Sequence, residues 1–178
     1  MIKNGVGGAN TQTGIIFEDK VDLCTFLNDQ VNDYHVENLD IGEGIYFKKD
    51  LVATSYKKHE LYKFLKSRNV DWKKILSKKL LPDDAVYIIK ENTVFILEIK
   101  FQQVPGSVDE KLQTCGFKLR QYKRLFSPLN YEVEFIYILN NWFKDDKYKD
   151  TLDYIIEMNC KYYFNYLPFD KMGLPVPK

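Results

Sequence analysis

Residues 82–101 read PDDAVYIIKENTVFILEIKF, and this stretch decides the fold. Two apolar runs, 85–89 and 94–101, are separated by the short polar segment 90–93. Runs rich in β-branched and aromatic residues on either side of such a segment are typical of a β-hairpin. We therefore expect two adjacent antiparallel strands, the second of them buried in a sheet.

Side-chain alternation decides where the charged residues of this hairpin lie. Glu98 and Lys100 point to the same face, about 6.6 Å apart along the strand at ~3.3 Å per residue. A turn of two or four residues places Asp83 on that face and Asp84 on the other. A turn of three or five residues, or a bulge, exchanges the two acids. We take Asp83 as the prediction and keep Asp84 as the alternative.

Two carboxylates and a lysine on one half-buried surface need a compensating partner, since desolvating a charge costs several kcal/mol. Mg²⁺ is such a partner, because it prefers oxygen ligands and keeps waters that a phosphate can replace. It would polarise a phosphodiester and activate a bound water, while Lys100 orients that water or neutralises developing charge. The pattern predicts a Mg²⁺ site with Asp83 and Glu98 as ligands. The alternative is an exposed cross-strand charge pair with Asp83 and Asp84 as turn residues.

The order Pro-Asp, Glu-x-Lys on the next strand, then a helix and a further strand resembles the PD-(D/E)XK nuclease superfamily. The resemblance covers roughly residues 14–139 and implies a restriction-endonuclease-like core, a mixed α/β (α+β) fold with a central mixed β-sheet flanked by helices. It implies that Asp83 and Glu98 bind metal and that Lys100 is the catalytic lysine. Glu18 is similar to an acid that many members place on the first core helix near the metal.

The segment after the catalytic strand is similar to that of type II restriction endonucleases. The resemblance implies DNA contacts for Gln102, Gln103 and Ser107. The Gln-x-x-x-Tyr signature of RecB-type nucleases is absent, because Phe117 stands four residues after Gln113. That departure lowers the weight of an exonuclease-like activity.

Length and composition predict one domain, residues 1–178, with a substantial core. No apolar run approaches the ~20 residues of a membrane helix, and the start lacks a signal-peptide core. The cysteines, Cys24, Cys115 and Cys160, are odd in number and have no Cys-x-x-Cys spacing. They predict reduced thiols rather than disulfides or zinc, and so a cytoplasmic protein. The lack of a long apolar run predicts that the protein does not associate with a membrane.

Charge is unevenly distributed along the chain although the net charge is only +1. Residues 48–79 hold eleven basic residues against three acidic ones, interleaved with aromatic residues. Such a segment, leading into Asp83, predicts a surface that follows nucleic-acid phosphates, and the DNA-binding candidates are Lys73, Lys74, Lys78 and Lys79. The alternative is a pair of helices with ordinary solvated faces.

Periodicity and turn residues place the remaining elements. We expect helices over 14–33, 59–68, 72–80, 108–125 and 149–158, and strands over 132–139 and 160–167. Ser107 and Glu110 match a capping box for the helix over 108–125.

These observations together predict a Mg²⁺-dependent endonuclease that acts on double-stranded DNA, as a sequence-specific type II restriction enzyme. A chain with one site needs a homodimer or a partner subunit to cut both strands. The alternatives are a structure-specific nuclease, such as a junction resolvase or repair nickase, and a non-catalytic DNA-binding subunit with the same fold.

Overall fold

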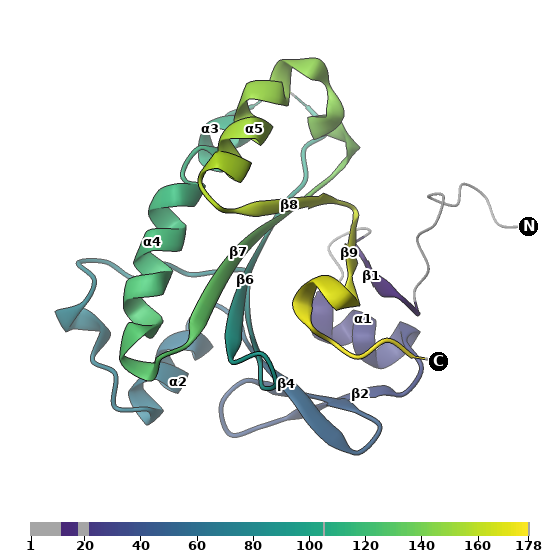
Figure 1. Ribbon diagram of the computed structural model, residues 1–178, viewed down its shortest axis with the longest axis vertical. Coiled ribbons are helices and arrows are strands. Elements are labelled where there is room, and N and C mark those ends of the chain that lie inside the picture. Colours follow the sequence, from purple (N-terminus) through teal and green to yellow (C-terminus); the bar gives the residue numbers. More distant parts are fainter. Residues whose placement is uncertain (1–11, 18–21, 105, 178) are drawn as a thin grey trace, which may run out of the picture.

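The computed structural model describes residues 12–17, 22–104 and 106–177 (Figure 1). The strands are β1 (Gly14–Ile16), β2 (Tyr34–Asn38), β3 (Glu43–Phe47), β4 (Asp50–Tyr56), β5 (Asp84–Ile88), β6 (Thr93–Lys100), β7 (Glu132–Leu139), β8 (Lys161–Phe164) and β9 (Tyr166–Pro168). The α-helices are α1 (Leu23–Gln30), α2 (Glu60–Ser67), α3 (Val108–Leu112), α4 (Cys115–Phe126) and α5 (Lys149–Glu157). Short 3₁₀ turns are η1 (Trp72–Lys74), η2 (Ser127–Leu129), η3 (Asn141–Lys144), η4 (Asp146–Tyr148) and η5 (Phe169–Met172).

Seven strands form a mixed central sheet in the order β2-β3-β4-β5-β6-β7-β8. Neighbours from β2 to β6 are antiparallel, whereas β6, β7 and β8 are parallel. The parallel pairs need crossovers, and helices α4 and α5 lie in the connections that supply them. The prediction of a mixed α and β fold with a central mixed sheet is confirmed at this level.

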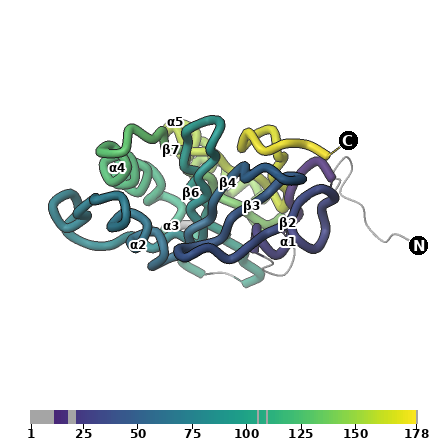
Figure 2. Tube along the Cα trace, turned by 90° about the horizontal axis from the view of Figure 1, so that it is seen from below, coloured from purple at the N-terminus to yellow at the C-terminus, as the bar shows by residue number. Residues whose placement is uncertain are grey.

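Helices cover both faces of the sheet, and each face has its own apolar core. Helices α2 and α4 pack over one core, whereas α1 and the C-terminal segment pack over the other (Figure 1). Figure 2, turned by 90°, again separates α1 and the C-terminal segment from α2 and α4. We call these the α4 face and the α1 face. The central strand β6 is buried on both, with Val94 and Ile96 on the α4 face and Phe95 and Leu97 on the α1 face.

The predicted hairpin is confirmed, with a four-residue turn over 89–92. Ile88 pairs with Thr93 and Asp84 pairs with Leu97. Asn92 ends the turn in the left-handed region at a φ of 49°, a conformation that Asn tolerates better than most residues. Turns of four and of two residues direct the side chains of β5 to the same faces of the sheet. Asp83 therefore lies on the side of Glu98 and Lys100, and Asp84 lies on the opposite side, as predicted.

The predicted helix over 14–33 is wrong in its first part. Residues Gly14–Ile16 form β1 and pair with β9, and Ile15 is fully buried. The helix begins at Leu23, because the Asp22 side chain accepts hydrogen bonds from the backbone N–H groups of Cys24 and Thr25. Pairing with a distant strand overrides the local helical period.

Three further predicted elements differ in extent. Only Trp72–Lys74 is helical in the range 72–80. At the end of that range, the hydroxyl of Tyr62 accepts from the backbone N–H of Leu80 and donates to its carbonyl oxygen, so the backbone of Leu80 is bonded to α2 instead of to a helix of its own. The helix over 108–125 is divided into α3 and α4, and Ser107 stands at the N-cap without a capping hydrogen bond. The final strand splits at Asn165, whose φ of 55° redirects the chain from β8 to β9.

Two of the predicted helices and one of the predicted strands agree with the structure, and several strands were not predicted. The helices over 59–68 and 149–158 correspond to α2 and α5, and the strand over 132–139 corresponds to β7. Strands β2, β3 and β4 were not predicted. In the described part of the chain, no helix is both long and apolar enough to cross a membrane.

Docking of α1 on the sheet gives a stability prediction. Leu27 is fully buried between α1 and the sheet, so Leu27→Ala should lower the free energy of unfolding by roughly 2–5 kcal/mol. Leu81→Ala is the matched control, because Leu81 is 43% exposed and its truncation should change stability by less than about 1 kcal/mol. Urea unfolding monitored by circular dichroism measures both, and equal effects would contradict the packing of α1.

Candidate active site

The candidate site forms where β6 ends and β5 begins, on the α4 face. Glu98 and Lys100 follow Val94 and Ile96 in the alternation of β6, so their side chains lie on the α4 face. Asp83 directly precedes β5, and its register places it beside the same end of β6. The backbone N–H of Ile99 donates to Asp83 Oδ2 over 3.0 Å, which fixes the carboxylate against β6.

Lys100 joins the two predicted carboxylates. Its Nζ lies 3.1 Å from Glu98 Oε2 and 3.4 Å from Asp83 Oδ2. Glu98 is almost fully buried, whereas Asp83 is partly exposed and accessible to a ligand from solvent. The structure therefore brings together the three side chains that the sequence selected for metal and catalysis.

Lys118 on α4 is a fourth member of this site and was missed as such from the sequence. Its Nζ donates to both oxygens of Glu98, at 2.8 Å and 2.7 Å. Lys118 stands three residues after Cys115 and four before Tyr122, both buried on α4, so it lies on the apolar stripe of that helix. A lysine on an apolar stripe was the signal that could have identified it.

The four side chains form a balanced set of charges. Two carboxylates face two ammonium groups, which offsets much of the cost of burying Glu98. Burial and then the negative charge of Glu98 raise the pKa of Tyr122 and of Tyr137, so both phenols stay neutral beside the site. A divalent ion bound to Glu98 would compete with Lys118 for the same carboxylate oxygens.

The residues after β6 take different positions. Gln102 is buried, its Nε2 donates to the carbonyl oxygen of Val104, and its backbone exchanges hydrogen bonds with the side chain of Asn140. Its Oε1 has no hydrogen-bond partner within the described ranges. Gln103 and Ser107 are exposed. Only these two of the three predicted DNA contacts therefore present a side chain freely to solvent.

The basic segment lies near the site through the start of α2. The backbone N–H of Lys58 donates to the carbonyl oxygen of Pro82, so the chain that enters α2 lies next to Asp83. Beyond it is a hollow of about 810 Å³ lined by the following side chains: His59, Tyr62, Lys63, Lys66, Asn69, Val70, Asp71, Trp72, Lys73 and Lys79. Lys79 Nζ lies over the rings of Tyr62 and Trp72, while Lys73, Lys74 and Lys78 are exposed.

Asp84, the alternative ligand, faces away from Glu98 and Lys100. It is buried on the α1 face, where its Oδ1 accepts a 2.6 Å hydrogen bond from Ser55 Oγ. Its Oδ2 has no hydrogen-bond partner among the residues described. Burial raises the pKa of Asp84 to about 7, against smaller lowering effects of the Ser55 hydrogen bond and the Lys57 charge.

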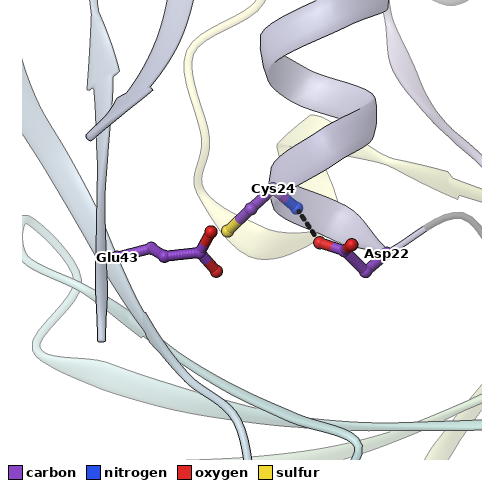
Figure 3. Close-up of side chains that lie close together, drawn as sticks. All are labelled: Asp22, Cys24 and Glu43. Carbon is purple, nitrogen blue, oxygen red and sulfur yellow. Dashed lines mark hydrogen bonds between the residues drawn. The ribbon is translucent and has the colours of Figure 1, made fainter. Parts of the chain in front are cut away.

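Three more polar side chains approach Asp84 from the α1 face and were not selected from the sequence. The register places Glu43 of β3 opposite Ser55 of β4, on the face shared by Asp84. Asp22 and Cys24 enter from the N-terminus of α1, and Figure 3 shows the Cys24 sulfur directed toward the Glu43 carboxylate. We call Asp22, Cys24, Glu43 and Asp84 the α1-face cluster.

Glu18, the fourth predicted catalytic residue, lies outside the described residues. Helix α1, the first helix of the described chain, packs with Leu97 on the face opposite to Glu98. The described part of α1 therefore contributes no carboxylate to the site of Glu98 and Lys100.

Comparisons with known proteins do not identify a family for this chain. No protein-family model matches it. Searches of curated proteins and of solved structures also give no match. The chemistry of the site must therefore be inferred from its residues.

The raised pKa of Asp84 gives a prediction for metal-free protein. The folded state holds the Asp84 proton up to a pH of about 7, whereas the unfolded chain loses it near its ordinary value of 3.8. The protonated Asp84 carboxyl therefore contributes its full stabilisation of the folded state below pH 3.8. This stabilisation is lost as the pH rises through the folded-state pKa of about 7. Relative to Asp84→Asn, the wild type should lose up to roughly 1.4 kcal/mol of unfolding free energy per pH unit.

Urea unfolding in a chelating buffer, at intervals from pH 5 to pH 8, measures this difference. Glu132→Gln, at the exposed start of β7, is the control and should run parallel to the wild type. A pH-independent difference between wild type and Asp84→Asn would show that Asp84 is ionised throughout.

Proposed function

We propose that this chain is a Mg²⁺-dependent endonuclease that hydrolyses phosphodiester bonds in double-stranded DNA. The observation that carries the proposal is the convergence of Asp83, Glu98 and Lys100 at the end of β6, with one ammonium group in reach of both carboxylates. Carboxylate pairs with an adjacent lysine suit hydrolysis by metal-activated water.

The order of elements around the site supports a restriction-endonuclease-like core. Strands β4, β5 and β6 are neighbours in the sheet and antiparallel, with α2 inserted between β4 and β5 along the chain. Helices α3 and α4 follow β6, and β7 lies parallel to β6. Apart from the inserted α2, this agrees with the order of three strands, helix and strand that the resemblance to PD-(D/E)XK nucleases implies. The proposed activity follows from the residues placed on that order, since a fold by itself does not imply a function.

Asp83 and Glu98 would hold the metal, and their hard oxygen donors fit Mg²⁺. When bound, Mg²⁺ supplies Lewis-acid polarisation of the phosphate and a bound water of lowered pKa. Lys100, which already contacts both carboxylates, is placed to orient the attacking water. Lys118, once its ammonium leaves Glu98, is placed to pair with the negative charge of the scissile phosphate.

The basic segment would bind the DNA phosphates next to this site. The chain enters α2 beside Pro82, so a duplex lying along Lys73, Lys74, Lys78 and Lys79 can reach Asp83. One site of this kind is seen in the described chain. Cutting both strands would therefore need a second copy or a partner subunit, as in a type II restriction enzyme.

A non-catalytic DNA-binding protein with the same fold is the second candidate. It is favoured by the complete pairing of Glu98 with Lys118 and Lys100, since these charges are balanced without a metal ion. In such a protein the ion pairs would only stabilise the junction of β6 and α4. A structure-specific nuclease has the same site as the main proposal and differs in its substrate.

Cleavage of supercoiled plasmid DNA tests the proposal. The wild type should cut the plasmid with Mg²⁺ and not with a chelator. Glu98→Gln, Asp83→Asn and Lys100→Met should each lower the rate by roughly 10²–10³-fold or more, because each removes a group that stabilises charge at the reacting phosphate. Asp84→Asn and Glu132→Gln are the matched controls and should keep the rate within a few-fold.

The products separate the candidates. Discrete fragments indicate a restriction enzyme, and cutting confined to branched DNA indicates a structure-specific nuclease. DNA binding without cleavage supports the non-catalytic candidate. Cleavage that survives Glu98→Gln would reject the site.

Binding of a labelled duplex over a range of salt concentrations tests the basic segment. Replacing Lys73, Lys74, Lys78 and Lys79 by Ala should weaken binding, and it should reduce the dependence of log affinity on log salt by about 0.9 for each DNA phosphate that the variant no longer neutralises. The control replaces four lysines around α5, Lys144, Lys147, Lys149 and Lys161. A salt dependence changed equally by both sets would contradict a specific DNA surface.

A further inference from the structure

Three of the four members of the α1-face cluster have donor atoms close enough together to share one metal ion. One ligand atom each from Asp22, Cys24 and Glu43 lies within 4.8 Å of the other two (Figure 3). These residues come from the start of α1 and from β3, far apart in the sequence and joined only by folding. Acidic groups alone occur often without a metal, so the cluster needs independent support.

That support comes from Asp84. Its side chain is more than nine-tenths buried, and its Oδ2 has no hydrogen-bond partner in the described chain. The register of β3, β4 and β5 aims it at the face where Glu43 and Ser55 lie. Ser55 donates to Asp84 Oδ1, and the Asp84 and Glu43 charges help to raise the pKa of the Cys24 thiol, after burial. A buried oxygen without a partner costs stability, so it marks a position where a further ligand is gained readily.

Lys57 occupies part of this space. Its Nζ donates to Asp22 Oδ1 over 3.0 Å and to Glu43 Oε2 over 2.6 Å. A single ammonium group thus bridges the carboxylates of α1 and β3, while Asp84 Oδ2 remains unpaired among the described residues. The carboxylates are already held in place by a cation, and one lysine does not satisfy all of them.

We propose that the α1-face cluster binds one divalent transition-metal ion of the Zn²⁺ class, with Asp22, Cys24, Glu43 and Asp84 as ligands. One sulfur and three carboxylate donors suit the four-coordinate preference of Zn²⁺, whereas Mg²⁺ and Ca²⁺ select all-oxygen sites. The ion displaces Lys57 and ties the start of α1 to β3 and β5. This site lies on the opposite face of the sheet from Glu98 and is independent of the proposed nuclease activity.

Co²⁺ reports the site directly, because a cysteine thiolate bound to Co²⁺ gives a near-ultraviolet charge-transfer absorption. Full-length reduced protein, stripped of metal by a chelator and desalted, is titrated with Co²⁺. We expect the band to saturate at one equivalent and to disappear on adding one equivalent of Zn²⁺, but not on adding excess Mg²⁺. Bound Zn²⁺ should also raise the melting temperature, since it binds only the folded chain.

Variants locate the ion. Cys24→Ser should abolish the band, whereas Cys115→Ser and Glu98→Gln should keep it. Glu43→Gln, which leaves the thiol in place, should weaken Co²⁺ binding at least tenfold, since even loss of an outer partner of a ligand costs roughly 10–100-fold. Lys57→Met should strengthen binding by removing the competing ammonium group.

Three results would overturn the proposal: absence of the band in the wild type, its survival in folded Cys24→Ser, or its loss in Cys115→Ser. Circular dichroism establishes that each variant is folded. If Cys24→Ser does not fold, the Co²⁺ affinities of Glu43→Gln and Lys57→Met test the site instead. An affinity equal to that of the wild type in both variants would reject the site. The Glu98→Gln variant separates this outcome from failure of the nuclease proposal, because it removes only the site on the α4 face.

Discussion

Antiparallel pairing of β5 with β6, at the centre of a sheet covered on both faces, constrains the whole molecule. Because both faces of β6 are buried, its alternate side chains must pack against α4 or against α1, and its register cannot slip without exposing one core. The same alternation directs the adjacent acids Asp83 and Asp84 into different layers. One dipeptide therefore supplies a carboxylate to each side of the sheet.

On each face of the sheet, lysine side chains pair with the carboxylates, but the pairing is more complete on the α4 face than on the α1 face. On the α4 face, Lys100 and Lys118 engage the nearly buried Glu98, and the number of positive groups equals the number of carboxylates. On the α1 face, Lys57 serves both Asp22 and Glu43, and Asp84 keeps an oxygen that no described residue pairs. Burial raises the pKa of Asp84, and the Ser55 hydrogen bond and the Lys57 charge offset that rise only in part.

Local sequence predicted the elements whose signals are strong and self-contained. The hairpin, β7, α2 and α5 follow from apolar periodicity and turn residues. Two of the errors involve contacts between distant residues. Strand β1 forms because β9 pairs with it, and Leu80, at the end of the range 72–80, is hydrogen-bonded to the Tyr62 hydroxyl of α2. Strands β2 and β4 lie in a meander whose pairing, rather than its apolar pattern, defines it.

By itself the sequence determined that Glu98 and Lys100 share a face, because alternation along a strand is a local property, and it narrowed the opposing acid to Asp83 or Asp84. Only the tertiary structure decided for Asp83, because the turn length sets the register. Folding also added Lys118 from α4 and assembled Asp22, Cys24 and Glu43 beside Asp84. These contacts join residues that are distant along the chain, and no spacing in the sequence encodes a distance across two packed layers.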